Sequence, residues 1–212
     1  MSISENIQKI KKELPTGVDL VAVSKTQPHS KIKVAYDSGH KIFGENKVQE
    51  LTEKYEKLPK DIRWHMIGHL QTNKVKYIAP FIDLIHAVDS EKILKEIDKR
   101  ASQNNRKIDC LLQVYIATEN TKFGFSENEL HKILLRKEEY KNVNIRGLMG
   151  MATFTNNNKQ IKEEFDYLSN IYNKHKDLNT LSMGMSGDYK IAIKSGSNMV
   201  RIGSTIFGAR NY

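Results

Sequence analysis

The chain has 212 residues, of which 39% are hydrophobic and only four are prolines, so it is long enough for one substantial core and too short for two independent domains. Its 34 basic and 25 acidic residues give a formal charge of +9, but the lysines alternate with acids at helical spacing and form no basic stripe with interleaved aromatics, which argues against nucleic-acid binding. No apolar stretch reaches the length of a signal-peptide core or a membrane span, so a cytoplasmic protein without a membrane partner is expected.

In chain order, short apolar or β-branched runs alternate with longer segments of helical periodicity. A first helix is predicted over residues 2–14. The predicted strands are Leu20–Lys25, Lys41–Glu45, Arg63–Gly68, Leu84–Val88, Cys110–Ile116, Ile145–Met151, Leu181–Met185 and Val200–Ile202. The helical segments between them are predicted to begin near His29, Lys47, Thr72, Ser90, Ser126, Asn158 and Asp188. Ser90 and Ser126 each precede a helical pattern, and each is expected to cap its helix with the side-chain oxygen.

This regular alternation predicts parallel strands joined by right-handed crossovers, and eight such strands close a barrel. The predicted fold class is therefore α/β, a single (β/α)8 TIM-like barrel with an extra N-terminal helix, spanning residues 1–212 as one domain. An open doubly wound sheet is the alternative. Only "GARNY" follows "STIFG" after the last strand, so the N-terminal helix is expected to fill the remaining outer position. The stretch "ENTKFGF", Glu119–Phe125, is expected to form a loop over the barrel mouth, with Lys122 toward solvent.

Disulfide and metal chemistry find little support in the sequence. Cys110 is the only cysteine, which excludes an internal disulfide and a cysteine-based zinc site. His65 and His69 are four residues apart, a spacing that converges on a helix but not on a strand entering a turn. The sequence therefore predicts no metal site.

The carboxyl ends of the predicted strands carry the candidate functional residues, because barrels of this kind place their chemistry there. Lys25 ends the first strand in "LVAVSKT", although a strand-ending lysine often reaches only into solvent. The last two strands end in "GMSGD" and "VRIGST", where Ser186 and Ser204 offer hydroxyls and Gly203 offers an unobstructed amide for phosphate. Arg201 precedes them on the last strand, and once buried it needs a partner, either a ligand or a structural carboxylate.

A lysine, a phosphate cradle and an arginine at one end of a barrel meet the needs of pyridoxal 5′-phosphate (PLP). PLP has an aldehyde that condenses with an amine, a phosphate group, and a ring nitrogen that requires a polar partner. PLP is therefore the predicted cofactor. A barrel aldolase that forms a lysine Schiff base with a phosphorylated sugar would use the same residue types and stays open as an alternative.

Six motifs occur in order over nearly the whole chain: "AVSKT", "FGENKVQE", "WHMIGHLQTNK", "GLMGMA", "LSMGMSGDY" and "VRIGSTIFGARNY". Together they resemble the pyridoxal phosphate homeostasis protein family, which is similar in fold to the N-terminal barrel domain of alanine racemase, PLP fold type III. The resemblance implies a Schiff base between PLP and Lys25, with Arg201 facing the pyridine nitrogen. It implies phosphate contacts from Ser186, Gly203 and Ser204, and positions near the cofactor ring for Asn46, His65 and Met149.

Two departures from the family pattern bear on these implications. Ser204 stands where threonine is usual, and it keeps the hydroxyl. Gln27 stands where some members have a second lysine two positions after the first, so a cofactor transfer assigned to that second lysine does not carry over to this chain.

The resemblance implies a protein that holds PLP as a reversible Schiff base and acts in intracellular vitamin B6 homeostasis, without robust amino-acid turnover and without assigned catalytic residues. Arg201 is expected to keep the ring nitrogen unprotonated, which weakens the ring as an electron sink. The tyrosine base that alanine racemase takes from a second domain has no expected counterpart here, since the chain ends at Tyr212. A PLP-dependent amino-acid racemase is the alternative. The expected partners are PLP and apo-enzymes that require it, and a monomer is expected.

Overall fold

The computed structural model describes residues 2–118 and 123–208. Lys122, which is predicted to point toward solvent, lies outside these ranges. Eight parallel strands form a closed barrel in chain order, with β1 also paired to β8. The strands are β1 (Asp19–Val23), β2 (Ile42–Glu45), β3 (Arg63–Met66), β4 (Leu84–Val88), β5 (Ile108–Gln113), β6 (Val143–Met149), β7 (Thr180–Met185) and β8 (Met199–Ile202). The closure confirms the predicted (β/α)8 barrel and rules out the open sheet.

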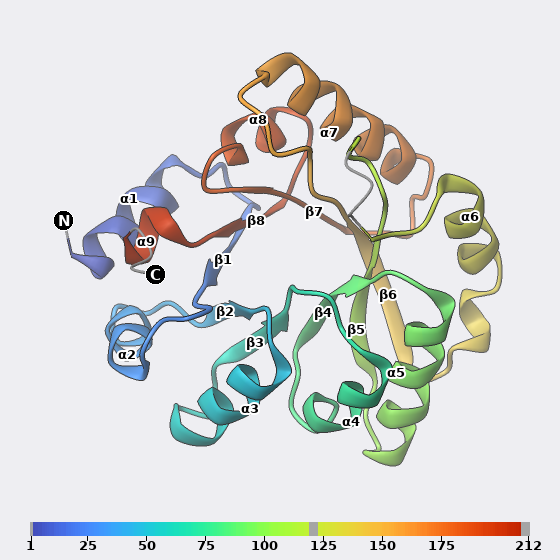
Figure 1. Ribbon diagram of the computed structural model, residues 1–212, viewed down its shortest axis with the longest axis horizontal. Coiled ribbons are helices and arrows are strands. Elements are labelled where there is room, and N and C mark those ends of the chain that lie inside the picture. Colours follow the sequence, from blue (N-terminus) through green and yellow to red (C-terminus); the bar gives the residue numbers. More distant parts are fainter. Residues whose placement is uncertain (1, 119–122, 209–212) are drawn as a thin grey trace.

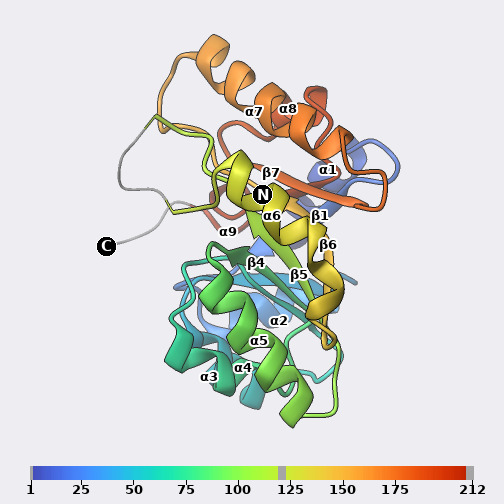
Figure 2. The ribbon, with the colours of Figure 1, turned by 90° about the vertical axis from the view of Figure 1, so that its right-hand side faces the viewer.

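Helices surround the strands on the outside of the barrel (Figure 1). Figure 2 shows α7 and α8 on one side of the strands and α3, α4 and α5 on the opposite side. The α-helices are α1 (Ile3–Glu13), α2 (His29–Asp37), α3 (Val48–Lys57), α4 (Val75–Ile78), α5 (Glu91–Gln103), α6 (Glu127–Leu135), α7 (Asn158–Asn173), α8 (Tyr189–Lys194) and α9 (Ser204–Phe207). Two 3-10 turns, η1 (Thr72–Lys74) and η2 (Lys137–Glu139), complete the described helical elements.

The N-terminal helix covers the seam where the barrel closes. Helix α1 lies beside α9 and α2 (Figure 1), and its residues Ile7 and Ile10 are buried. The Asn6 side chain donates a hydrogen bond to the Ile206 carbonyl at 3.0 Å, which ties α1 to α9. The predicted outer position of the first helix is therefore confirmed.

The apolar core has two parts, as the alternation of side chains along each strand requires. Residues that point outward pack under the helices in one large cluster, which includes the fully buried Phe43 and Trp64. Residues that point inward form a smaller cluster inside the barrel, made of Val21, Leu84, Ala87, Leu111, Met149 and Met199. The barrel is thus filled by side chains and contains no open channel at this level.

The predicted boundaries differ from the observed ones mainly at the strand ends. β4 matches its predicted range, whereas β5 ends at Gln113; the Val114 amide still donates to the Met149 carbonyl of β6 at 2.9 Å, and Val114 forms an isolated bridge with Phe125. The cap predicted at Ser126 is confirmed, since its hydroxyl accepts from the Glu129 amide and the Glu129 carboxylate accepts from the Ser126 amide. The cap predicted at Ser90 is wrong, because Ser90 occupies the N-cap position of α5 without a side-chain hydrogen bond.

This difference predicts unequal costs for the same substitution at the two helix starts. We expect Ser126→Ala to lower the free energy of unfolding by about 1 kcal/mol, since the reciprocal bonds of the capping box are lost. Ser90→Ala should change it by less than about 0.5 kcal/mol. Urea denaturation followed by circular dichroism measures both values, and equal losses in the two variants would contradict this interpretation.

Candidate functional site

A cleft of about 590 Å³ opens at the carboxyl ends of the strands. Six of the eight residues predicted for the site line it, and they come from both ends of the chain. These are Lys25, Asn46, Ser186, Arg201, Gly203 and Ser204. The loop between β6 and α7, with Met151 to Asn156, forms another wall. The volume falls within the usual range for cofactor and small-molecule sites.

Lys25 reaches the cleft because of the two-residue period of the first strand. Val21 points into the barrel core, Val23 lines the cleft, and Lys25 continues the same row two residues later. The lysine is half-buried and lies just beyond the end of β1. An apolar strand thus ends on a lysine because the row of inward side chains passes from the packed core into the cleft.

The turn after Lys25 is strained and held in place from outside the barrel. Thr26 has a φ of +64°, in the left-handed region that a β-branched residue adopts at a cost of about 1–3 kcal/mol. Its amide donates to Glu50 Oε1 at 2.5 Å, and the Gln27 amide donates to the Ser24 carbonyl at 3.0 Å. These bonds fix the backbone on the C-terminal side of the lysine.

A buried ion cluster beneath this turn, formed by Glu45, Glu50 and Lys54, fixes the N-terminal side as well. Lys54 is 3% exposed, and its Nζ donates to the Ser24 carbonyl at 2.8 Å, to Glu45 Oε1 at 2.8 Å and to Glu50 Oε1 at 2.6 Å. The Ser24 hydroxyl donates to Glu45 Oε1 at 2.5 Å. Burial raises the pKa of Glu45 to about 7, although Lys54 and Ser24 oppose the shift. The residues on both sides of Lys25 are therefore bonded to the Glu45–Glu50–Lys54 cluster.

Sequence reasoning missed the Glu45–Glu50–Lys54 cluster, although one signal was available. In α3 the buried positions Val48 and Leu51 are three residues apart, and Lys54 is the next position of the same row. A lysine in the apolar row of a helix must find a buried partner. Nothing in the sequence alone identified Glu45, on the outward face of β2, as that partner.

The other end of the cleft carries hydroxyls and backbone amides from the loops after β7 and β8. The Gly203 amide donates to the Ser186 hydroxyl at 3.2 Å, which joins the two loops. A Cβ on Gly203 would lie 3.2 Å from the Val23 carbonyl oxygen and 3.3 Å from the Val23 Cβ, so a side chain here would press on β1. The Asp188 carboxylate accepts from the Met185 amide at 2.5 Å and holds the turn after β7.

Arg201 is the charged floor of the cleft. It is 3% exposed, and its Nη1 donates to the Ser182 carbonyl at 2.9 Å and the Ser182 hydroxyl at 2.5 Å, while Nη2 donates to the Gly150 carbonyl at 3.0 Å. Among residues 2–118 and 123–208 no carboxylate forms a salt bridge with the guanidinium, although the charge of Asp188 acts on it and raises its pKa. Burial lowers the pKa of Arg201 to about 10, which leaves it positively charged at neutral pH.

His65 and Met149 do not line the cleft. Met149 is fully buried in the inner apolar cluster, and His65 is fully buried on β3, with its ring nitrogens bonded to Asp83 and His86. Their predicted proximity to a cofactor ring stays a prediction. His69 lies elsewhere, on the surface, where its Nδ1 is 2.7 Å from Asp89 Oδ2. Within the described residues, no three histidine, cysteine or acidic side chains gather as metal ligands would.

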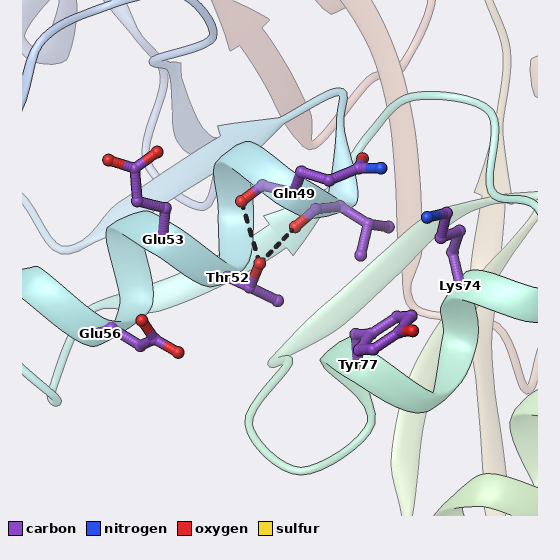
Figure 3. A pocket seen from close by; sticks show the side chains of 7 residues that line it. Gln49, Thr52, Glu53, Glu56, Lys74 and Tyr77 are labelled. Carbon is purple, nitrogen blue, oxygen red and sulfur yellow. Dashed lines mark hydrogen bonds between the residues drawn. The ribbon is translucent and has the colours of Figure 1, made fainter.

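A second cleft of about 340 Å³ lies on the outer helical layer, between α3 and the η1–α4 segment (Figure 3). Glu53 and Glu56 line one side, and Lys74 and Tyr77 line the other. The Thr52 hydroxyl donates back to carbonyls of its own helix, Val48 at 3.0 Å and Gln49 at 2.9 Å. None of the predicted site residues lies here, so the cleft at the strand ends is the candidate functional site.

The chain is similar to known proteins over nearly its whole length. Residues 1–211 match the family model described as alanine racemase, N-terminal domain. The chain is 38% identical to a pyridoxal phosphate homeostasis protein of Aquifex aeolicus over 99% of this chain and 96% of that protein. It is 36% identical to a protein of the same name from Haemophilus influenzae over 100% of this chain and 98% of that protein.

Solved structures give the same picture. PipY of Synechococcus elongatus, solved with PLP bound, superposes with a TM-score of 0.91 at 32% identity, over 98% of this chain and 100% of that chain. Alanine racemase of Bartonella henselae superposes with a TM-score of 0.74 at 17% identity, over 98% of this chain and 58% of that chain. At that identity the racemase shares the fold alone.

The Glu45–Glu50–Lys54 cluster generates a prediction that is independent of any ligand. We expect Lys54→Met to lower the free energy of unfolding by about 3 kcal/mol, because it leaves a buried carboxylate without its cation. Lys57→Met is the control on the same helix, since Lys57 pairs with Glu53 at an exposed position, and it should cost less than about 0.5 kcal/mol. Guanidinium titrations of both variants measure the difference, and similar midpoints would argue against the cluster as a support of the Lys25 turn.

Proposed function

The chain belongs to the pyridoxal phosphate homeostasis protein family and carries the alanine racemase N-terminal barrel, and from this we infer that it binds PLP and acts in PLP homeostasis. Full-length similarity to proteins of that name supports the function, and the PLP-bound PipY neighbour supports the cofactor. The finer proposal concerns the residues. We place PLP in the cleft at the strand ends, with Lys25 as its covalent partner.

The observation that carries this placement is the buried charge of Arg201. A guanidinium has five N–H donors, and three hydrogen bonds to described residues are found at Arg201. Two donors on a buried cation thus remain for a ligand at the floor of the cleft. A ring nitrogen with a lone pair fits these donors, and the hydroxyls of Ser186 and Ser204 at the other end of the cleft fit a phosphate group.

PLP, when bound, supplies an aldehyde that reacts reversibly with an amine. In the proposed arrangement Lys25 presents its amine to the cleft, and the strained turn held by the Glu45–Glu50–Lys54 cluster limits the movement of its backbone. Ser186, Gly203 and Ser204 orient the phosphate, and Asn46 contributes a polar group on the β2 side of the cleft. Arg201 donates to the ring nitrogen and, because two adjacent cations repel, keeps it unprotonated.

The cleft is better suited to holding PLP than to turning over amino acids. Racemisation by two bases requires a proton acceptor on each face of the substrate carbon. Among the described residues that line the cleft, only Lys25 and Asp188 have side chains of the kind that serve as proton acceptors, and the Asp188 carboxylate accepts a hydrogen bond from the Met185 amide. We therefore propose storage and release of the cofactor, with racemisation at most a weak side activity.

The remaining parts of the proposal concern the setting of the protein. No described helix has both the length and the apolar character needed to cross a membrane. We propose a cytoplasmic monomer in which residues 1–212 form one PLP-binding domain. Its proposed partners are PLP itself and apo-enzymes that require PLP, and neither nucleic acid nor a membrane is among them.

The covalent role of Lys25 is tested by chemical trapping. After incubation with PLP, borohydride reduction should leave a phosphopyridoxyl group on the tryptic peptide that contains Lys25, detected by mass spectrometry. Lys25→Ala should lose this modification, whereas Lys47→Ala, which removes an exposed lysine at the end of β2, should keep it. Wild-type protein that remains unmodified would contradict the proposal and favour an aldolase, in which the lysine forms its Schiff base with a phosphorylated sugar.

The shortage of proton acceptors among the described residues of the cleft predicts little turnover. PLP-loaded protein given L-alanine should form D-alanine at a rate at least about a thousandfold below that of a two-base racemase, because general base catalysis by one residue contributes about 10²–10⁴-fold. Chiral chromatography measures the product. Rapid racemisation that stops in Lys25→Ala would instead identify the protein as an enzyme.

A further inference from the structure

A continuous hydrogen-bonded chain of side chains crosses the barrel interior beneath the cleft. It runs from Asp83, before β4, through His65 on β3 and His86 on β4 to Ser182 on β7 and Arg201 on β8. Successive donor–acceptor distances are 3.2 Å from Asp83 Oδ2 to His65 Nε2, 3.0 Å from His65 Nδ1 to His86 Nε2, 3.1 Å from His86 Nδ1 to Ser182 Oγ, and 2.5 Å from Ser182 Oγ to Arg201 Nη1. We call these five residues the interior relay.

The two ends of the interior relay determine the direction of every bond in it. Asp83 is held ionised, since His65 and Arg63 lower its pKa despite partial burial, and a carboxylate can only accept. His65 Nε2 must therefore carry the proton, and in a neutral ring its Nδ1 then accepts from His86 Nε2. His86 Nδ1 is then left as an acceptor, so the Ser182 hydroxyl gives it its hydrogen, and Ser182 Oγ accepts from the guanidinium of Arg201, which can only donate. The carboxylate end thus requires the Nε2–H tautomer in both neutral histidines, and the guanidinium end is compatible with it.

Burial supports neutral rings in the middle of the interior relay. His65 and His86 are fully buried, and burial lowers the pKa of both, with the nearby Arg201 and His65 adding to the effect at His86. A second proton on either Nδ1 would also remove an acceptor and break the relay. All donors point from Arg201 toward Asp83, so the bond dipoles are aligned favourably with the cation at one end and the anion at the other.

A packing role alone does not account for the interior relay. The barrel interior is otherwise filled by an apolar cluster that includes Val21, Leu84, Leu111, Met149 and Met199, and apolar residues at positions 65, 86 and 182 would avoid the cost of burying polar groups. The relay instead connects the cleft cation to the carboxylate of Asp83, which is 35% exposed and also binds Arg63 at 3.0 Å. Because the guanidinium keeps its protons at neutral pH, the relay can orient Arg201 but not draw a proton from it.

We propose that the other four members of the interior relay, Asp83, His65, His86 and Ser182, are positioning residues that act through Arg201. They fix the orientation of its guanidinium so that the remaining N–H groups face the cleft. The cofactor ring nitrogen that accepts from these groups then stays unprotonated. This inference rests on the proposed function, in which Arg201 faces that nitrogen. In this proposal His65 acts on the cofactor through Arg201 and does not contact the ring.

The first test needs no cofactor. Two-dimensional ¹H–¹⁵N NMR of the apo-protein, with spectra tuned to the histidine rings, should show two neutral imidazoles with the proton on Nε2, assigned to His65 and His86 by their loss in His65→Gln and His86→Gln. An Nδ1–H tautomer or a charged ring at either position would overturn the proposed direction of the relay, whatever the protein binds.

The second test asks whether the interior relay acts on the cofactor site. Ser182→Ala removes the hydroxyl that joins His86 to Arg201 and keeps the Ser182 carbonyl contact. With PLP labelled with ¹⁵N at the ring nitrogen, we expect its resonance to move toward the protonated position relative to wild type, and PLP affinity to fall by about tenfold. Ser197→Ala is the control: Ser197 is a buried serine between β7 and β8 whose hydroxyl bonds only to backbone groups of the described residues, and both readouts should stay at wild-type values.

The same measurements on Asp83→Asn test the relay from its other end, and they replace Ser182→Ala if that variant does not fold. Asp61→Asn is the control, because Asp61 is an exposed aspartate that pairs with Lys41. Asp83→Asn removes the anion and keeps an acceptor for His65, so a smaller movement in the same direction is expected. Unchanged ring-nitrogen resonance and affinity in both relay variants would overturn the proposal. Failure of the wild-type protein to form the Lys25 adduct would reject the proposed function. The histidine tautomers measured in the apo-protein would be unaffected by that outcome, since they do not depend on PLP.

Discussion

The pairing of the first strand with the last is the interaction on which the candidate site depends. β1 and β8 are hydrogen-bonded in parallel, with Val21 opposite Arg201. This register brings Lys25, near the start of the chain, to the same cleft as Arg201, Gly203 and Ser204, near its end. The inward row of each strand then determines which side chains reach the cleft. Helix α1 packs on α2 and α9, the helices that follow these two strands.

Two polar networks support the cleft, and each places charge where water is excluded. The Glu45–Glu50–Lys54 cluster lies outside the barrel wall and bonds to the backbone on both sides of Lys25. The interior relay lies inside the wall and bonds to the guanidinium of Arg201. In a low-dielectric environment such bonds are strong and leaving one unmade is costly, so the backbone beside Lys25 and the guanidinium of Arg201 are held more firmly than surface groups would be.

Much of the fold and of the cleft could be predicted from residue patterns. The alternation of strands and helices predicts the barrel, and because parallel strands end on the same side, it predicts that Lys25, Asn46, Ser186 and Arg201 lie together. The Ser90 cap was wrong because residue type does not determine whether the side chain turns toward the helix end. The expected position of His65 beside a cofactor ring stays a prediction; its side chain points from β3 into the barrel interior, where it meets His86.

The sequence by itself determined the strands, the barrel and which strand ends meet at its mouth, because hydrophobic periodicity is a local property of the chain. Only the tertiary structure decided the partners of the buried charges. His86 and Ser182, or Glu45 and Lys54, meet through the packing of elements whose spacing and rotation depend on every neighbouring side chain. A hydrogen bond requires its two atoms to lie within a few tenths of an ångström of their ideal separation, and periodicity along a sequence cannot specify positions across a barrel to that tolerance.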